Sequence, residues 1–388
     1  MTPPATQSVT VTAPALSRFA WIDWMRGLAC VVMFQTHCYD AWLGGTARDG
    51  SFLKGSQLLG TLPAPIFLFV AGISFALVTD KLIRKNLSAS AITRTMARRG
   101  AEILAFGFLF RLQEFVIAWG WAPWSDLLRV DILNIIGLSM ILMALLCGLV
   151  LRITDRFRSM LVGGSLATAT VIALLTPPLY TTWRPTWLPW PLESYIDGCH
   201  NLGAPQSWLF PLFPWAAFAF SGLAAGFILF SDSGRGETAK LLGWFAGIGS
   251  AAIAIAYAFD HSPIHLYATY DYWHTSPNFL MMRVGLLLLI AFLCYAWCQW
   301  GWATYGFSPL IQLGQTSLLV YWVHIEFVYG RFSLLAKRAQ SIGGATRGLV
   351  EIFLFMLVLS LLRTRIDWKR LDWKHLTWRK VVRPVQTA

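Results

Sequence analysis

Ionisable side chains lie inside apolar segments of this sequence, where each one needs a partner or a function. The segment WIDWMRGLACVVMFQTHCYDAW carries Asp23 and Arg26 near its start and His37 and Asp40 near its end. Placing such a group at mid-membrane costs roughly 2.5 to 3.5 kcal/mol on insertion scales. A histidine exchanges protons near neutral pH, and a carboxylate one helical turn away can orient its ring. His37 is therefore a candidate general base oriented by Asp40, although a lone histidine in an apolar helix is most often a satisfied core residue.

A second histidine occurs late in the sequence, in the segment GQTSLLVYWVHIEFVYG. This segment places His324 and Glu326 towards its far end. With His37 and Asp40, these two residues complete our set of candidate catalytic residues. A reaction that develops negative charge on an oxygen also requires a hydrogen-bond donor for it, and His324, Tyr321 or Gln35 has the chemistry to supply one.

Charged residues in other apolar segments form a third group. The cations Arg26, Arg98 and Arg99 have the charge to hold the phosphates of an anionic substrate. For Arg98 and Arg99 the alternative is that they only set membrane orientation. Asp23 with Arg26, and Arg111 with Glu114, are spaced three apart, so each pair can form an ion pair on one helix face. The residues expected in supporting polar roles are Asp23, Glu102, Arg111, Glu114, Arg129 and Asp131.

These polar residues separate into two layers along the predicted spans. The inner layer contains Arg26, Arg98, Arg99 and Glu102, and the outer layer contains His37, Asp40, Asp131, His324 and Glu326. Two layers suit a reaction whose substrates arrive from opposite sides of a membrane. They also suit a transporter with a charged pathway.

The composition determines which elements must position these residues. Of 388 residues, 56% are hydrophobic and only 13% are charged, which excludes a water-soluble globular enzyme. The sequence predicts an all-α, polytopic membrane protein with about ten transmembrane helices. A single helical domain over 18–363 is expected, with a disordered tail at 1–17 and a basic, Trp-rich interfacial tail at 364–388. The apolar runs are 20–44, 59–79, 100–122, 129–151, 159–176, 208–230, 240–259, 278–299, 309–329 and 347–363.

Basic residues gather in the connections after the second, fourth and sixth spans and in the C-terminal tail, so both termini are expected to be cytoplasmic. The basic group at 331–347 departs from this rule. The net charge of +12 is explained by this topology, and we expect no nucleic-acid partner. The six cysteines are scattered without metal or disulfide spacing and are expected to serve packing, with no metal site. Small residues in PAPIFLFVAGIS and FSGLAAGF should allow close helix packing.

Several motifs, taken in order, carry a family resemblance: IDWMRGLA, a histidine late in the first span, PAPIFLFVAGISFAL, RVDILNIIGL, FPW and TSLLVYWVHIE. This order resembles the heparan-alpha-glucosaminide N-acetyltransferase-like bacterial membrane family, within the wider transmembrane acyltransferases, from about residue 18 to about 360. The resemblance implies a membrane enzyme of ten or eleven helices. Such an enzyme takes an acyl group from cytoplasmic acyl-CoA, a co-substrate and not a tightly bound cofactor, and delivers it to an acceptor on the far side, often a sugar. It also implies a central role for His37, as base or as transient acyl carrier.

The sequence therefore predicts a membrane acyltransferase that uses acyl-CoA, most simply acetyl-CoA, and a sugar or envelope-glycan acceptor. The expected location is the bacterial cytoplasmic (inner) membrane, with membrane lipid as a further partner and a homo-oligomer left open. Heparan itself is not implied, because the chain lacks room for the additional lumenal region and helix of the lysosomal members. A secondary transporter and a non-catalytic membrane scaffold are the alternatives.

Overall fold

The computed structural model describes residues 19–366 except 202, 207–208, 232–233, 235, 269–270 and 301–305. All regular elements in the described part are helices, which confirms the predicted all-α fold class. The predicted N-terminal tail at 1–17 lies outside the described residues. The C-terminal tail was predicted to begin at 364, but the last helix continues to Arg365. The rest of this tail, from residue 367 onwards, also lies outside the described residues.

Ten apolar runs were predicted, and each of them overlaps a helix or a broken pair of helices. The helices are α1 (Ala20–Trp42), α2 (Gly45–Asp49), α3 (Ser51–Gly60), α4 (Pro63–Arg84), α5 (Ala89–Ile117), the 3₁₀ turn η1 (Trp124–Leu128), α6 (Ile132–Ile153), α7 (Phe157–Tyr180), α8 (Trp190–Ile196), α9 (Leu212–Leu229), α10 (Thr238–Asp260), α11 (Pro277–Trp300), α12 (Pro309–Gln315), α13 (Ser317–Val328) and α14 (Ile342–Arg365).

Seven helical segments in the described part are long and apolar enough to cross a membrane, so the chain is an integral membrane protein. They contain α4, α6, α7, α9, α10, α11 and α14. The predicted count of about ten is not confirmed. The other three predicted spans correspond to α1 and α5, which carry several charged residues, and to the broken pair α12 and α13. These three are the elements that supply most of the polar residues considered above.

Helix α5 begins eleven residues earlier than its apolar run. Ser88 caps it by accepting a hydrogen bond from the backbone N–H of Ala91 (3.3 Å). Its first three turns are rich in basic residues, which an apolar-run criterion excludes from the helix. Arg98 and Arg99 therefore lie well inside a helix and not in a connection between helices.

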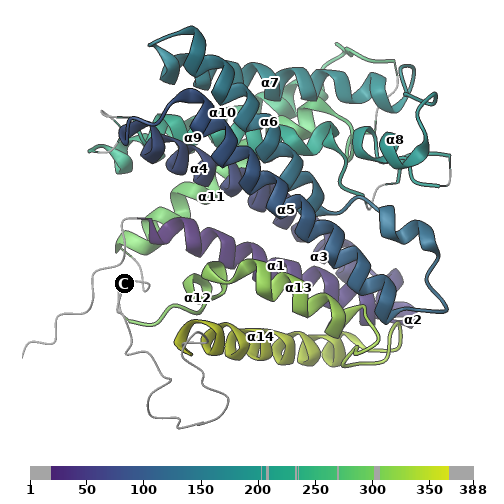
Figure 1. Cartoon of the computed structure of the whole chain (residues 1–388). Coiled ribbons are helices and arrows are strands. Elements are labelled where there is room, and N and C mark those ends of the chain that lie inside the picture. The colour runs from purple at the N-terminus through teal and green to yellow at the C-terminus, as the bar shows by residue number, and fades with distance from the viewer. Residues whose placement is uncertain are drawn as a thin grey trace, which may run out of the picture.

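Helix α1 joins two groups of helices. Helices α12, α13 and α14 pack on one side of it, and α4 and α11 pack on the other, as Figure 1 shows in its lower and upper halves. The second group continues through the packed pairs α4 with α9, α5 with α6, α7 with α9 and α10 with α11. Helices α12, α13 and α14 from the C-terminal part of the chain thus pack directly against α1 from its N-terminal part.

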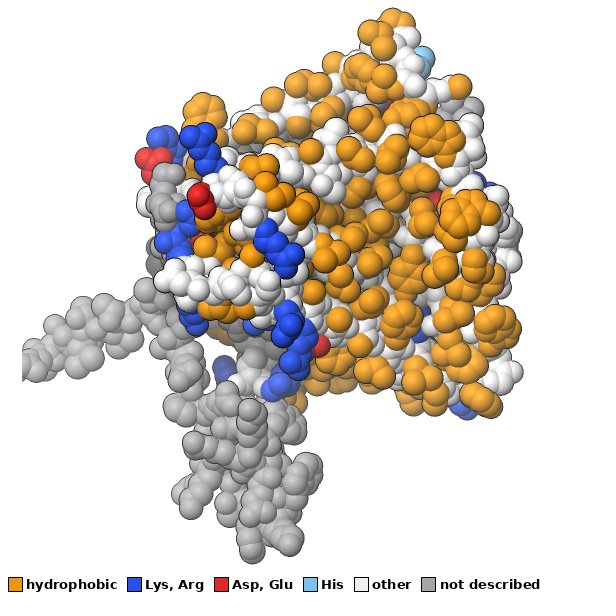
Figure 2. All heavy atoms as spheres, turned by 45° about the horizontal axis from the view of Figure 1, so that its top comes forward, with side chains coloured by type: hydrophobic (Ala, Val, Ile, Leu, Met, Phe, Trp, Pro, Cys, Tyr) orange, Lys and Arg blue, Asp and Glu red, His pale blue; other side chains and the backbone are white. Residues whose placement is uncertain are grey.

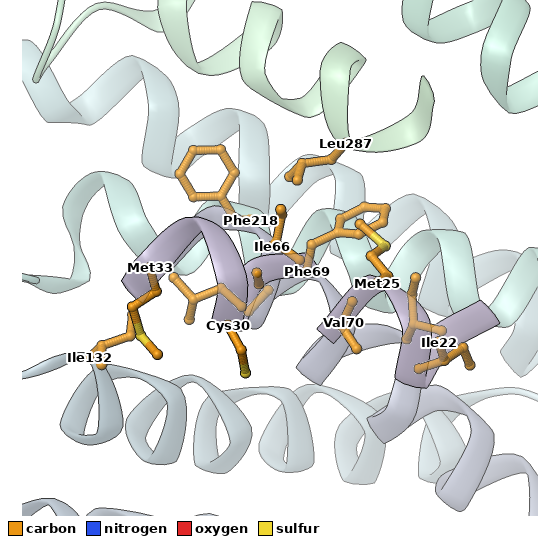
Figure 3. Packing of buried hydrophobic residues seen from close by; sticks show 14 of the residues in the cluster. Ile22, Met25, Cys30, Met33, Ile66, Phe69, Val70, Ile132, Phe218 and Leu287 are labelled. Atoms are coloured by element: carbon orange, nitrogen blue, oxygen red, sulfur yellow. The ribbon is translucent and has the colours of Figure 1, made fainter. Parts of the chain in front are cut away.

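The core is formed where α1 faces α4. Figure 3 shows Met25, Cys30 and Met33 of α1 against Phe69 and neighbouring residues of α4, with Ile132, Phe218 and Leu287 contributed by α6, α9 and α11. All six cysteines are buried and unbridged, as expected for packing residues. The apolar face of α1 is therefore in the core, and His37 on another face of the helix contacts α13.

Glycines on both helices allow one of these pairs, α4 with α9, to approach closely. A Cβ at Gly222 of α9 would lie 1.9 Å from the carbonyl oxygen of Phe69, and one at Gly72 of α4 would lie 2.1 Å from that of Ala219. The predicted packing role of the small residues in these two segments is confirmed.

The surface separates by side-chain type. In Figure 2, hydrophobic side chains cover most of the face shown, whereas Lys and Arg side chains gather towards one edge. This is the distribution expected of a lipid-facing belt next to basic connections.

Candidate functional site

Two histidines that are 287 residues apart meet where α1 and α13 face each other. Nδ1 of His37 lies 2.9 Å from Nε2 of His324. The ring planes differ by 6°, and the ring centres are 5.2 Å apart. That separation is close to the longest that a 2.9 Å contact between ring nitrogens allows, so the rings meet edge to edge in one plane. His324 is fully buried and His37 is half-buried.

The hydrogen bonds assign the protons of the neutral pair. Nδ1 of His324 lies 2.9 Å from the carbonyl oxygen of Val320, and a carbonyl only accepts, so this nitrogen carries the proton. Nε2 of His324 then has a free lone pair and accepts from Nδ1–H of His37. Nε2 of His37 is left unprotonated and makes no hydrogen bond within the described part of the chain. An unprotonated imidazole nitrogen held this way is a base or a nucleophile.

Aromatic rings pack closely around the two histidines. The ring centres of Phe34 and His324 are 5.0 Å apart, and those of Tyr329 and His37 are 5.3 Å apart. Tyr321 contacts His324 edge-on at 5.9 Å. These contacts hold both imidazole rings between aromatic neighbours.

Asp40 lies one turn from His37 but orients other groups. One carboxylate oxygen accepts from Tyr329 (2.9 Å) and the other accepts from Arg48 (3.0 Å), which also donates to the Asp40 carbonyl. No hydrogen bond joins Asp40 to His37 among the described residues. The predicted orienting role therefore moves from Asp40 to His324, because the side chain of Asp40 is held by Arg48 of α2 and by Tyr329 at the end of α13.

A buried ionic network borders the histidine pair. Asp131 accepts from Arg111 and from the hydroxyl of Tyr321 (2.7 Å), and it caps α6 through a capping box with Asn134. Arg111 also pairs with Glu114 (2.6 Å), as their spacing predicted. Since the Tyr321 hydroxyl donates to Asp131, it is not free to donate to an oxyanion.

Glu326 belongs to a second polar contact between α5 and α13. Its carboxylate accepts from the side-chain amide of Gln113 (2.8 Å), whose oxygen accepts from the indole N–H of Trp322. Glu326 is buried, and its position is set by this amide and not by an ion pair. Gln113 was missed at the level of sequence, although a glutamine inside the apolar run FRLQEF is a detectable signal.

The two remaining candidates from the sequence, Gln35 and Arg129, lie apart from the histidine contact. The amide of Gln35 donates to the carbonyl of Ser56 at 3.5 Å. Arg129 lies at the entrance to α6, directly after η1, two residues before the network residue Asp131.

A cavity of about 410 Å³ lies between α4, α5, α6 and α13. One end of it reaches Tyr321, which bonds to Asp131 of the ionic network. Its walls are mostly apolar, and its polar lining includes Arg26, Ser74, Arg99, Glu102 and Tyr321. The lining on α5 runs from Met96 to Phe106, about 15 Å at 1.5 Å per residue. The cavity therefore connects the basic layer with the neighbourhood of His324.

Two of the three predicted phosphate-binding arginines line this cavity. Arg26 bonds to Asp23 (2.9 Å), which confirms their predicted pairing, and also to Ser74 (2.6 Å). Arg99 lines the wall beside Glu102. Arg98 is not among the lining residues. Its side chain is 80% exposed and pairs with Glu102 at 3.0 Å.

One comparison with known proteins identifies the family of the chain. No curated protein matches the chain. The family model described as heparan-alpha-glucosaminide N-acetyltransferase, catalytic, matches residues 18–263, which is more than half of the chain. The match includes His37 and the parts of α4, α5 and α6 that line the cavity, whereas His324 lies beyond it. The chain therefore belongs to the heparan-alpha-glucosaminide N-acetyltransferase catalytic family of membrane acetyltransferases, as the resemblance in its sequence indicated.

Proposed function

We propose that this protein transfers an acetyl group from cytoplasmic acetyl-CoA to a hydroxyl or amine of a sugar or envelope glycan on the outer side of the bacterial cytoplasmic membrane. The observation that carries the proposal is the hydrogen bond between His37 and His324, which leaves Nε2 of His37 as an unprotonated base. Membership of a membrane acetyltransferase family supports the reaction class. The acceptor class rests on the family resemblance, and the sidedness rests on the two polar layers.

In the proposed reaction, Nε2 of His37 takes the proton of the acceptor as the acceptor oxygen or nitrogen attacks the thioester carbonyl. The carbon–sulfur bond then breaks, the acetyl group stays on the acceptor, and the proton returns from His37 to the departing thiolate. His324 stabilises the transient imidazolium because its lone pair accepts from Nδ1–H of His37. The same nitrogen also suits a two-step route through an acetyl-histidine.

The cavity supports a binding site for the donor. A CoA thioester combines an anionic phosphate end with a long uncharged arm. Arg26 and Arg99 offer positive charge, and the apolar wall between α4 and α6 offers a passage for the arm. The donor is thus proposed to enter from the basic layer and to present its thioester towards Tyr321.

The experiment uses the full chain purified in detergent. We expect acetyl-CoA to raise its melting temperature, and free CoA to appear only when a suitable amino sugar or glycan is added. His37→Ala should abolish CoA release while keeping the thermal shift, and His274→Ala, in an exposed loop, should behave as wild type. An unchanged rate in His37→Ala would contradict the proposal. Substrate flux in proteoliposomes without CoA release would instead favour a transporter.

A detergent-purified sample also separates the two routes. Radiolabelled acetyl-CoA without acceptor should leave label on the protein only in the route through acetyl-histidine, and His37→Ala should remove that label.

A further inference from the structure

Tyr321 stands at the boundary between the cavity and the histidine pair. Among the residues that line the cavity, it is the one whose ring also contacts His324, with ring centres 5.9 Å apart. The two residues lie three apart on α13, so they share one face of the helix. Any group that passes from the cavity to the histidines meets this phenol ring.

The ring of Tyr321 is held in place from several directions. Its hydroxyl donates to Asp131 at 2.7 Å, and Asp131 is itself bonded to Arg111. Phe110 packs against the ring, with ring centres 5.5 Å apart, and only 8% of Tyr321 is exposed. To move the ring would break a hydrogen bond to a buried carboxylate, which is costly in an apolar surrounding. Tyr321 is therefore a rigid wall and not a mobile side chain.

The two sides of this wall differ: a cavity lies on one side, and the closely packed aromatic rings around the histidines, here called the narrow part, lie on the other. On the donor side lies the cavity of about 410 Å³. On the histidine side, Phe34 and Tyr329 pack at 5.0 and 5.3 Å from the imidazole rings. A donor whose arm fills the cavity and whose thioester lies at Tyr321 must place the carbons of its acyl group in the narrow part.

We propose that Tyr321 sets the length of the acyl group that this protein transfers, so that a two-carbon group is accepted and a six-carbon group is rejected. The inference rests on the proposed function, since it concerns the donor of that same reaction. It assigns the limit to one side chain, because removing that ring would widen the passage between the narrow part and the cavity and give a longer chain room to fold back.

The test compares kcat/KM for acetyl-, butyryl- and hexanoyl-CoA in the full chain. One methylene too many in a close-fitting pocket costs roughly 10- to 200-fold, so wild type should use hexanoyl-CoA at least about 100-fold less well than acetyl-CoA. Tyr321→Ala should raise the ratio of hexanoyl to acetyl transfer at least about tenfold. Tyr321→Phe keeps the ring and should keep most of the limit, although it loses the bond to Asp131.

Met140→Ala is the matched control. Met140 lines the cavity on α6, far from Tyr321. It lies about 12 Å along the helix axis, at 1.5 Å per residue, from Ile132, which follows the Tyr321 partner Asp131. Its exchange enlarges the space for the donor arm but not the space for the acyl carbons. Whatever it does to absolute rates, it should leave the hexanoyl-to-acetyl ratio unchanged.

The outcomes separate the inference from the function on which it rests. If wild type transfers hexanoyl as well as acetyl groups, the inference is wrong even if Tyr321→Ala cannot be purified. It is also wrong if Tyr321→Ala folds and keeps the wild-type ratio, or if Met140→Ala changes the ratio equally. If wild type neither binds nor turns over any acyl-CoA, the proposed function itself is wrong.

Discussion

Replacing His324 tests the proton assignment of the histidine pair. In His324→Ala, Nδ1–H of His37 loses its acceptor at 2.9 Å, and the imidazolium formed during the reaction loses a buried hydrogen bond. A hydrogen bond to a charged group contributes about 1.5 to 3 kcal/mol. Because each 1.36 kcal/mol is tenfold in rate, kcat should fall by about 10- to 160-fold. His37→Ala removes the base itself and should cost about 10² to 10⁴ or more.

Two further variants make the reasoning testable. His324→Gln offers an amide oxygen near the position of Nε2, so it should recover part of the lost rate, whereas His324→Leu should not. The double variant of His37 and His324 should be no slower than His37→Ala alone, because the second histidine acts through the first. Rates are measured as CoA release, with size-exclusion profiles to verify folding. If His324→Ala were as slow as His37→Ala and glutamine gave no recovery, His324 would be the reacting group and the assignment would be wrong.

Three more predictions concern the donor, the ionic network and the packing. Arg99→Ala should raise the KM for acetyl-CoA about tenfold, an effect of one charge-assisted contact. The neighbouring Arg98→Ala should change it less than about twofold, because the Arg98 side chain is 80% exposed and does not line the cavity. Asp131→Asn removes one of the two carboxylate partners of Arg111 and leaves Glu114. It should destabilise the protein by less than the about 3 to 5 kcal/mol that an unpaired buried charge costs, measured as a lower melting temperature without acetyl-CoA. Gly222→Ala should lower the melting temperature or prevent folding, because its Cβ would lie 1.9 Å from a backbone oxygen, and an unchanged melting temperature would show that α4 and α9 separate easily.

Much of the fold could be predicted from the sequence because a bilayer simplifies the problem. A segment that crosses it must be helical and mostly apolar, so hydropathy alone located all the long helices. The errors occurred where helices carry charge. Helix α5 begins well before its apolar run, since the arginines of its first turns are compatible with a helix but not with a hydropathy criterion.

The site was predictable only as a set of candidates. Sequence spacing correctly paired Asp23 with Arg26 and Arg111 with Glu114, because residues three apart on a helix must share a face. The same rule failed for Asp40, which is close to His37 along the helix but is bonded to Tyr329 and Arg48. Such contacts depend on partners from other helices, which spacing along a single helix cannot predict.

The sequence by itself determined the class of protein, the family and the residue types available for chemistry, because these depend on composition and on the order of local motifs. Only the tertiary structure decided that His37 and His324 share a hydrogen bond and that Tyr321 separates them from a cavity. The physical reason is that α1 and α13 are brought together by packing across 287 residues of chain. The backbone carbonyl of Val320 then fixes the proton of His324 on Nδ1 and leaves Nε2 of His37 unprotonated. The proposed function depends on this unprotonated nitrogen.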